Sequence, residues 1–276
     1  MTPSARDPDR ALFADELRAM RKHAGWTQEE LADKIGYSGS TIANIETQHR
    51  GATKDQARRL DGAFGLPGTF ARLEERLRGV PFSAGFRPFH PYEAEARSLR
   101  WFEHVLIPGL LQTENYARAV LSTRPVTTTD EIEERVTARL ARQAILDRED
   151  PPPPMLWVLL DENVLYRDVG GAKVMREQLL HLVEMARRPT VAVQIVPYSA
   201  GPHSGLLGSF IIAEPDDSGA IVYLENAHEG QTVEDAATVA NMALTFDALR
   251  LEALPGSASL SLIERVAEER WKGTAP

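Results

Sequence analysis

The sequence predicts two folded parts: a mainly α N-terminal domain of five helices, and an α/β (α+β) C-terminal domain with a small mixed sheet of about four strands. Three observations support this. Five amphipathic segments occupy the first 78 residues, strand-like apolar runs and helical segments alternate after residue 150, and 276 residues exceed the needs of one small helical domain. We expect domains at residues 1–78 and 93–276, joined by a strap at 79–92.

The first helix is expected from about Leu12 to Ala24. Phe13, Leu17 and Met20 recur within it at spacings of four and three residues, which places them on one face of a helix. This face should pack into the core of the first domain.

The segment from Thr27 to Glu46 predicts two short helices joined by a tight turn. Thr27 and Glu30 form a capping box at the start of the first of them. Gly36 supplies the positive φ at which that helix stops, and Ser38 should cap the second helix. The pattern is typical of a helix-turn-helix.

The second of these helices combines a buried face with a polar one. Ile42 and Ile45 should be buried, whereas short side chains face outward. The outward residues are Gly39, Ser40, Thr41 and Asn44. A helix with such a face fits the major groove of DNA, where these groups can bond base edges and phosphates.

Two more helices complete the expected bundle. Thr53 and Gln56 form another capping box, which opens a fourth helix. The fifth helix follows, with Phe70, Leu73 and Leu77 on its apolar face.

Residues 12–78 resemble the five-helix domain of Xre-type (lambda and 434 repressor-like) regulators. The resemblance implies that Gln28 bonds a phosphate and can reach an outer base, that Gly39, Ser40 and Asn44 face base edges, and that Ser38 and Thr41 face phosphates. Arg50 and Lys54, in or near the next loop, are further phosphate-contact candidates. The expected DNA-binding residues are Thr27, Gln28, Ser38, Gly39, Ser40, Thr41, Asn44, Arg50 and Lys54.

Two details qualify this comparison. Gly39 has no side chain, so one usual reader of bases is missing and Asn44, which can pair with adenine, gains importance. Arg21 and Glu46 match a pair that links the first helix to the end of the recognition helix, and an ordinary surface ion pair is an equally good interpretation.

Charge is divided unevenly along the chain. Residues 1–80 hold 13 Lys and Arg against 12 Asp and Glu, a net charge of +1, whereas residues 81–276 hold 18 against 28, a net charge of −10. The first domain, called the headpiece below, should bind DNA weakly by itself because its net charge is only +1. We therefore expect a homodimer on double-stranded DNA, with its headpieces about one helical turn, ~34 Å, apart.

Composition limits the cellular compartment and the ligands that we expect for this protein. The chain contains no cysteine, its N-terminal segment lacks an apolar signal region, and no apolar run reaches membrane-spanning length. We expect a cytoplasmic, nucleoid-associated protein without membrane contact, cofactor or metal.

The strap at 79–92 is rich in Pro, Gly and Phe. A flexible linker would not carry Phe82, Phe86 and Phe89, because exposed aromatic side chains are unfavourable in water. Packing across a domain surface is the main interpretation, and an aromatic platform for nucleic acid is the alternative.

The second domain should begin with helices. Ala96, Leu99 and Phe102 have helical spacing within residues 93–106, Thr113 opens a second helix, and a third is expected from about Thr129 to Arg148. The IPGLLQT and YARA segments resemble a group of actinobacterial Xre regulators with a large, antitoxin-like C-terminal domain. The resemblance implies a small partner protein encoded by a neighbouring gene.

The remainder predicts an α/β unit. A strand, a helix and a strand with short connections should form a parallel crossover, and two later strands should form an antiparallel hairpin. The strands are expected at 155–160, 190–197, 208–214 and 220–226, and the helices at 173–187, 231–250 and 259–270.

This topology predicts a second site at the carboxyl ends of the parallel strands. Asp161 and Glu162 follow the first strand, and Tyr198 and His203 follow the second. A groove for a partner or ligand is one interpretation and an ordinary solvated loop is another. An acid–base pair, or a metal site of His203, His228 and a carboxylate, has little support, since no catalytic or metal motif is present. We expect no enzyme.

Two functions remain. The chain is either a regulator whose C-terminal domain dimerises and receives a signal from a partner protein or ligand, or an antitoxin-like protein that mainly sequesters a small partner and binds DNA for autoregulation.

Overall fold

The computed structural model describes residues 8–78, 85–123, 128–216, 219–226 and 230–272. The chain divides into two compact units, Met1–Pro81 and Phe82–Pro276. Each unit has its own hydrophobic core.

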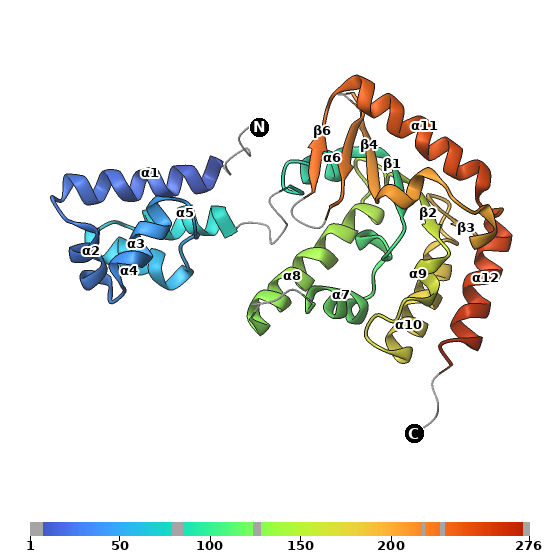
Figure 1. Ribbon diagram of the computed structural model, residues 1–276, viewed down its shortest axis with the longest axis horizontal. Helices are drawn as coiled ribbons and strands as arrows, with labels where there is room; N and C mark the ends of the chain where they lie inside the picture. Colours follow the sequence, from blue (N-terminus) through green and yellow to red (C-terminus); the bar gives the residue numbers. More distant parts are fainter. Residues whose placement is uncertain (1–7, 79–84, 124–127, 217–218, 227–229, 273–276) are drawn as a thin grey trace. The chain divides into compact units, whose positions relative to one another are not determined.

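Within residues 8–78 the first unit holds five helices, as the sequence predicts (Figure 1). Their core is made by side chains that include Phe13, Leu17, Ile42, Leu60 and Phe70. The helices are α1 (Pro8–His23), α2 (Gln28–Ile35), α3 (Gly39–Glu46), α4 (Lys54–Phe64) and α5 (Thr69–Arg78). The side chain of Leu77, expected in this core, lies outside the described residues.

The residues at the ends of these helices show which of the predicted caps form. Both capping boxes are present: Thr27 with Glu30 opens α2, and Thr53 with Gln56 opens α4. Gly36 ends α2 at φ 72°. Ser38 stands at the N-cap of α3, but the prediction that its side chain caps the helix is wrong, because its Oγ instead lies 2.9 Å from the Oγ of Ser40.

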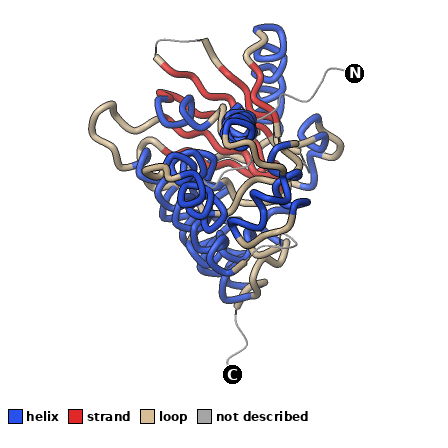
Figure 2. The backbone as a smooth tube through the Cα atoms, turned by 90° about the vertical axis from the view of Figure 1, so that its left-hand side faces the viewer, coloured by secondary structure: helices blue, strands red, loops and turns tan. Residues whose placement is uncertain are grey.

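The second unit is built on a mixed sheet, also as predicted, although its described residues form six strands rather than about four (Figure 2). The strand order is β3-β2-β1-β4-β5-β6, in which β1, β2 and β3 are parallel and the others pair antiparallel. The strands are β1 (Ala96–Glu103), β2 (Met155–Asp161), β3 (Val191–Val196), β4 (Phe210–Pro215), β5 (Ile221–Leu224) and β6 (Gln231–Val233).

The predicted helix at 93–106 is wrong. A short helix, α6 (His90–Glu95), leads directly into β1, which lies between β2 and β4 at the centre of the sheet. Trp101 and Phe102 are both buried, in the clusters on opposite faces of the sheet. A strand buried on both faces can have apolar residues at consecutive positions. Ala96, Leu99 and Phe102, which lie three positions apart, therefore also matched the spacing of a helical face.

Helices cover both faces of the sheet. α11 (Ala236–Glu252) packs on one face through Phe246 and Leu249, while α7 (Glu114–Leu121), α10 (Ala172–Met185) and α12 (Gly256–Glu269) contribute to the cluster on the other (Figure 1). α8 (Thr129–Arg142) packs beside α7, and the single-turn α9 (Asn163–Tyr166) follows β2.

The predicted crossover and hairpin are confirmed. β2 and β3 are parallel neighbours joined through α10, and β4 and β5 form an antiparallel pair. The helix expected to extend to Arg148 ends at Arg142, where the 3₁₀ turn η2 (Gln143–Leu146) begins. The region expected as a helix from 231 opens with β6, and α11 starts at Ala236.

The second half of the strap belongs to the core of the second unit. Phe86 and Phe89 are buried against Tyr223, with ring centroids 5.1 and 5.5 Å from its ring. Their role is packing. Phe82 lies outside the described residues.

Candidate functional site

The recognition helix α3 presents the polar face that its sequence predicts. Ile42 and Ile45 are buried, whereas Ser40 and Asn44 are exposed on the opposite side. Thr41 and Gly39 are half-buried at the edge of this face.

The other expected contact residues surround α3. Thr27 and Gln28 lie at the start of α2, Ser38 lies at the N-cap of α3, and Lys54 begins α4. Arg50 lies in the loop after α3, where its N–H donates to the carbonyl of Asn44 at 3.1 Å. Thr27, Ser38, Arg50 and Lys54 are exposed.

The start of α3 has the features of an anion site. The Ser38 side chain makes no bond to the first N–H groups of the helix, and its Oγ lies 3.0 Å from the Oγ of Thr41. Uncapped N–H groups and the positive end of the helix dipole favour a phosphate oxygen. The hydroxyl groups of Ser38, Ser40 and Thr41 lie beside them.

Glu46 fixes the end of α3 to the two preceding helices. Its carboxylate accepts from Arg21 Nε at 2.6 Å and Nη2 at 2.9 Å, and from Gln28 Nε2 at 2.8 Å. Glu46 is only 2 % exposed, so the interpretation of an ordinary surface ion pair is wrong. Burial raises its pKa, but the hydrogen bonds from Arg21 and Gln28 outweigh burial and hold the pKa below the usual glutamate range.

This arrangement also defines the position of Gln28. Its amide nitrogen is held by Glu46, so any DNA contact that Gln28 makes depends on the same network that orients α3.

Gly39 has a packing role that its sequence position does not reveal. A Cβ at this position would lie 2.8 Å from Cγ of Glu29 on α2. The glycine permits the close approach of α2 and α3.

On the second unit, the structure brings the four predicted rim residues together. His203 Nε2 lies 3.2 Å from Asp161 Oδ2, and Glu162 Oε2 accepts from the backbone N–H of Tyr198 at 2.8 Å. Their exposure differs strongly. Tyr198 is 59 % exposed, whereas Asp161 is 7 % exposed and is also bonded by the N–H of Asn163.

Sequence reasoning missed a buried polar chain beside this rim. Ser209 Oγ donates to Glu103 Oε2 at 2.5 Å and lies 2.9 Å from His104 Nδ1, and Trp101 Nε1 donates to Glu103 Oε1 at 3.0 Å. Glu103 ends β1, which lies next to β2, so both strands deliver carboxylates to one edge of the sheet. The wrong helix at 93–106 concealed this neighbourhood.

Burial shifts the pKa values of the titratable groups in this buried polar chain. It raises the pKa of Glu103 to about 8, with the Glu225 carboxylate as the second cause, so the Glu103 carboxyl is mostly protonated at neutral pH. Burial also lowers the pKa of His104. A protonated acid and a neutral imidazole joined by one hydroxyl form a stable internal network without a net charge.

The loop over the rim is tightly seated. A Cβ at Gly205 would lie 2.3 Å from Cζ of Phe102, and the ring of Phe102 meets that of His203 edge-on at 6.1 Å. The 3₁₀ turn η4 (Ser204–Leu207) therefore lies directly on the end of β1.

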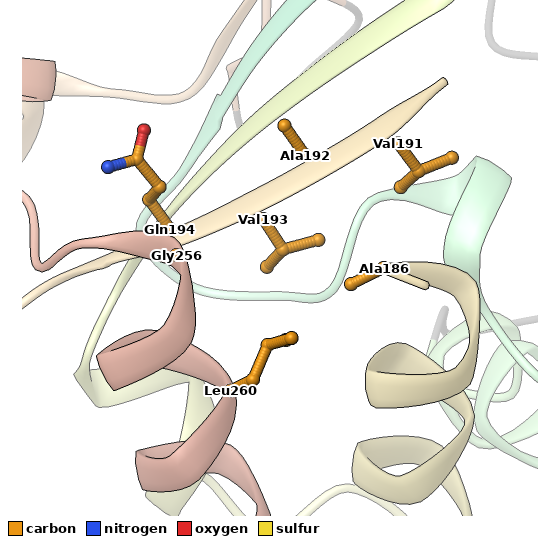
Figure 3. A pocket seen from close by; sticks show the side chains of 7 residues that line it. All are labelled: Ala186, Val191, Ala192, Val193, Gln194, Gly256 and Leu260. Atoms are coloured by element: carbon orange, nitrogen blue, oxygen red, sulfur yellow. The ribbon is translucent and has the colours of Figure 1, made fainter. Parts of the chain in front are cut away.

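A hollow of about 440 Å³ lies elsewhere, along the edge strand β3 (Figure 3). Val193 and Leu260 point into it from β3 and α12, whereas Ala192 and Gln194 point to the other side of the strand. No lining side chain is ionisable, and the Gln194 amide donates to the carbonyl of Leu254 at 2.9 Å. The residues that line the hollow supply no acid, base or nucleophile.

Among the described residues, no three His, Cys, Asp or Glu side chains are grouped closely enough to hold a metal ion. His228, considered as a ligand, lies outside them. In the same part of the chain, no helix is both long and apolar enough to cross a bilayer.

A five-helix unit with an exposed polar recognition helix defines the class of protein as a helix-turn-helix DNA-binding regulator. In agreement, residues 12–73 match the family described as "Helix-turn-helix domain". Residues 86–265 match "Domain of unknown function (DUF5753)", and since this match covers more than half of the chain, the protein belongs to the DUF5753 family. No curated protein and no solved structure matches the chain.

Proposed function

We propose that this protein is a sequence-specific transcriptional regulator of the Xre type, which binds double-stranded DNA as a homodimer and acts in the cytoplasm on nucleoid DNA. The observation that carries the proposal is the exposed polar face of α3, with Asn44 at its centre and the uncapped helix start beside it. Asn44 reads a base, and the helix start, Arg50 and Lys54 contact phosphates.

The test is the substitution Asn44→Ala. It should weaken binding to the operator by about 1–3 kcal/mol, roughly 5-fold to 150-fold, and leave binding to random DNA nearly unchanged, because only a base contact carries sequence information. Affinities would be measured by fluorescence anisotropy at one fixed salt concentration, on an operator selected from random-sequence DNA.

Asn115→Ala provides a matched control, since Asn115 is an exposed helical asparagine of the second unit whose side chain bonds Glu177. It should leave both affinities unchanged. An equal loss on both DNAs for Asn44→Ala would remove Asn44 as a base reader.

We further propose that the second unit is not an enzyme but receives a signal at the rim around Tyr198, from a partner protein or a small ligand. The exposed Tyr198 ring, held beside the ring of Tyr166 at 6.2 Å, is the feature that favours a docking role. An antitoxin-like function, in which this unit sequesters a small partner, is the alternative.

Purification from native cells distinguishes the two functions. Sequestration requires a small protein that copurifies in a fixed stoichiometric ratio and is lost when Tyr198 is replaced by Ala. A regulator does not require such a protein in a fixed ratio and should still bind its operator when purified without it.

A further inference from the structure

α11 is apolar on two opposite faces. The inner face packs on the sheet through Phe246 and Leu249. The outward side carries five exposed apolar residues at helical spacing: Ala237, Ala240, Leu244, Ala248 and Leu251. A surface helix ordinarily turns polar and charged side chains to water, and a helix apolar all round is normally covered on both sides.

We name these five residues the α11 outer face. Its two leucines are strongly exposed, Leu244 at 68 % and Leu251 at 87 %. The turn η4 contacts α11 and adds the exposed Leu206 and Leu207. Four of the six exposed large hydrophobic side chains in the described residues therefore lie on α11 and η4, a concentration that is typical of an interaction surface.

We infer that the α11 outer face is the docking surface for a second copy of this chain, with the two α11 helices packed antiparallel about Leu244. The inference rests on the homodimer of the proposed function and names its interface.

The spacing of the face favours a second copy over an unrelated partner. Counted from Leu244, apolar residues lie four residues away on both sides and seven residues away on both sides. A twofold antiparallel arrangement places each position opposite its symmetry mate. Leu244 then meets Leu244 of the other copy, Ala240 faces Ala248, and the large Leu251 faces the small Ala237.

Charge also favours this surface. Residues 81–276 carry a net charge of −10, so two copies of this part of the chain repel each other overall. The five residues of the outer face carry no ionisable group; Asp247 flanks the face, and the exposed Arg250 and Glu252 lie at the C-terminal end of the helix. In the antiparallel pair the two Asp247 residues are six positions apart, or ~9 Å along the helix axis, so they do not meet.

The size of the face predicts how strong the dimer is. A helix of 17 residues is ~25 Å long, and a strip of that length and one helix wide is smaller than the ~800 Å² that a standard interface buries on each partner. Even with the leucines of η4, the free dimer should be weak and reversible. Two headpieces bound to one operator would hold it together.

A single introduced thiol tests the arrangement, since the chain contains no cysteine. Leu244→Cys places the thiols of two copies at the twofold axis, so diamide oxidation of the full-length protein should give a disulfide-linked dimer. Ala258→Cys, at an exposed position of α12, is the matched control and should give several-fold less. The yield for Leu244→Cys should rise on operator DNA and also at high protein concentration without DNA.

A second variant keeps the test independent of disulfide geometry. Leu244→Glu should weaken self-association in sedimentation equilibrium at least tenfold, whereas Ala258→Glu should not change it. Leu244 is exposed, so neither the fold nor binding to a single half-site should change.

Three results would overturn the inference. One is an equal cross-linking yield for the two cysteine variants. Another is protection of the Leu244→Cys thiol from maleimide in the monomer, which would show that another part of the same chain covers the face. The third is a different protein that copurifies and is lost with Leu244→Glu. Each leaves the DNA-binding proposal standing, because that is decided separately by Asn44→Ala.

Discussion

The buried glutamates Glu46 and Glu103 show how local surroundings shift the pKa of one residue type in opposite directions. Glu46 receives hydrogen bonds from the guanidinium of Arg21 and the amide of Gln28, and its pKa is lowered. Glu103 receives hydrogen bonds from neutral Ser209 and Trp101, and its pKa is raised to about 8 by burial. A charged partner decides the difference, since both side chains are removed from water.

Glu103 gives the second unit a defined pH dependence. A carboxyl whose pKa is higher in the folded chain than its unfolded value of about 4.3 binds its proton more tightly when folded. Its contribution to the free energy of unfolding is therefore largest below about pH 4.3 and is lost as the pH rises to about 8. Glu103→Gln should flatten this decline, because its neutral amide can still bond Ser209 and Trp101.

Urea unfolding of the parent and Glu103→Gln at several pH values between about 5 and 8 measures the effect. The variant should gain stability relative to the parent at each step toward higher pH. Glu149→Gln, at an exposed loop position, is the matched control and should follow the parent. A difference between parent and Glu103→Gln that is constant across this pH range would contradict the raised pKa.

At the scale of elements, local signals in the first unit were sufficient to predict its five helices. Capping boxes at Thr27 and Thr53 and the glycine stop at Gly36 are decided within a few residues, and sequence shows them directly. Ser38 failed as a side-chain cap because its hydroxyl has nearby hydroxyl partners in Ser40 and Thr41. The sequence predicted that Ser38 stands at the N-cap of α3, but it did not predict the orientation of the Ser38 side chain.

β1 could not be recognised by the same means. Its apolar residues serve both faces of the sheet, so neither an alternating nor a helical period distinguishes them, and its pairing with β2 and β4 connects residues far apart in sequence. The short strand β6 was missed within an expected helix. The rim residues after β2 and β3 were nevertheless brought together as predicted, because a crossover of neighbouring parallel strands places both ends at one edge.

The polar chain of Glu103, His104 and Ser209 was missed for a related reason. Its members come from the end of β1, from the residue that follows it and from the loop before β4, and only the tertiary pairing of these strands makes them neighbours. Sequence contains no short motif for such a cluster. Likewise, Gly39 was noted for its lack of a base-reading side chain, whereas its contact with Glu29 depends on how α2 and α3 cross.

At the scale of the whole molecule, the distribution of charge favours the proposal that two copies act together on DNA. The first 80 residues carry a net charge of only +1, and the rest of the chain, at −10, adds no attraction for DNA. Affinity for an operator should therefore come from two headpieces linked through their second units, which converts the second binding event into an intramolecular one.

The last prediction compares the full-length chain with the headpiece alone, residues 1–81, which has its own hydrophobic core. On a single half-site the two should bind with similar affinity. On an inverted repeat the full-length chain should bind at least ~100-fold more tightly, with about twice the salt dependence, because linked headpieces release counterions together. Moving one half-site by about 5 base pairs turns it to the opposite side of the duplex and should remove the advantage. Fluorescence anisotropy on the three DNAs measures these differences, and equal affinities of the two proteins for the inverted repeat would show that the second unit does not join the headpieces.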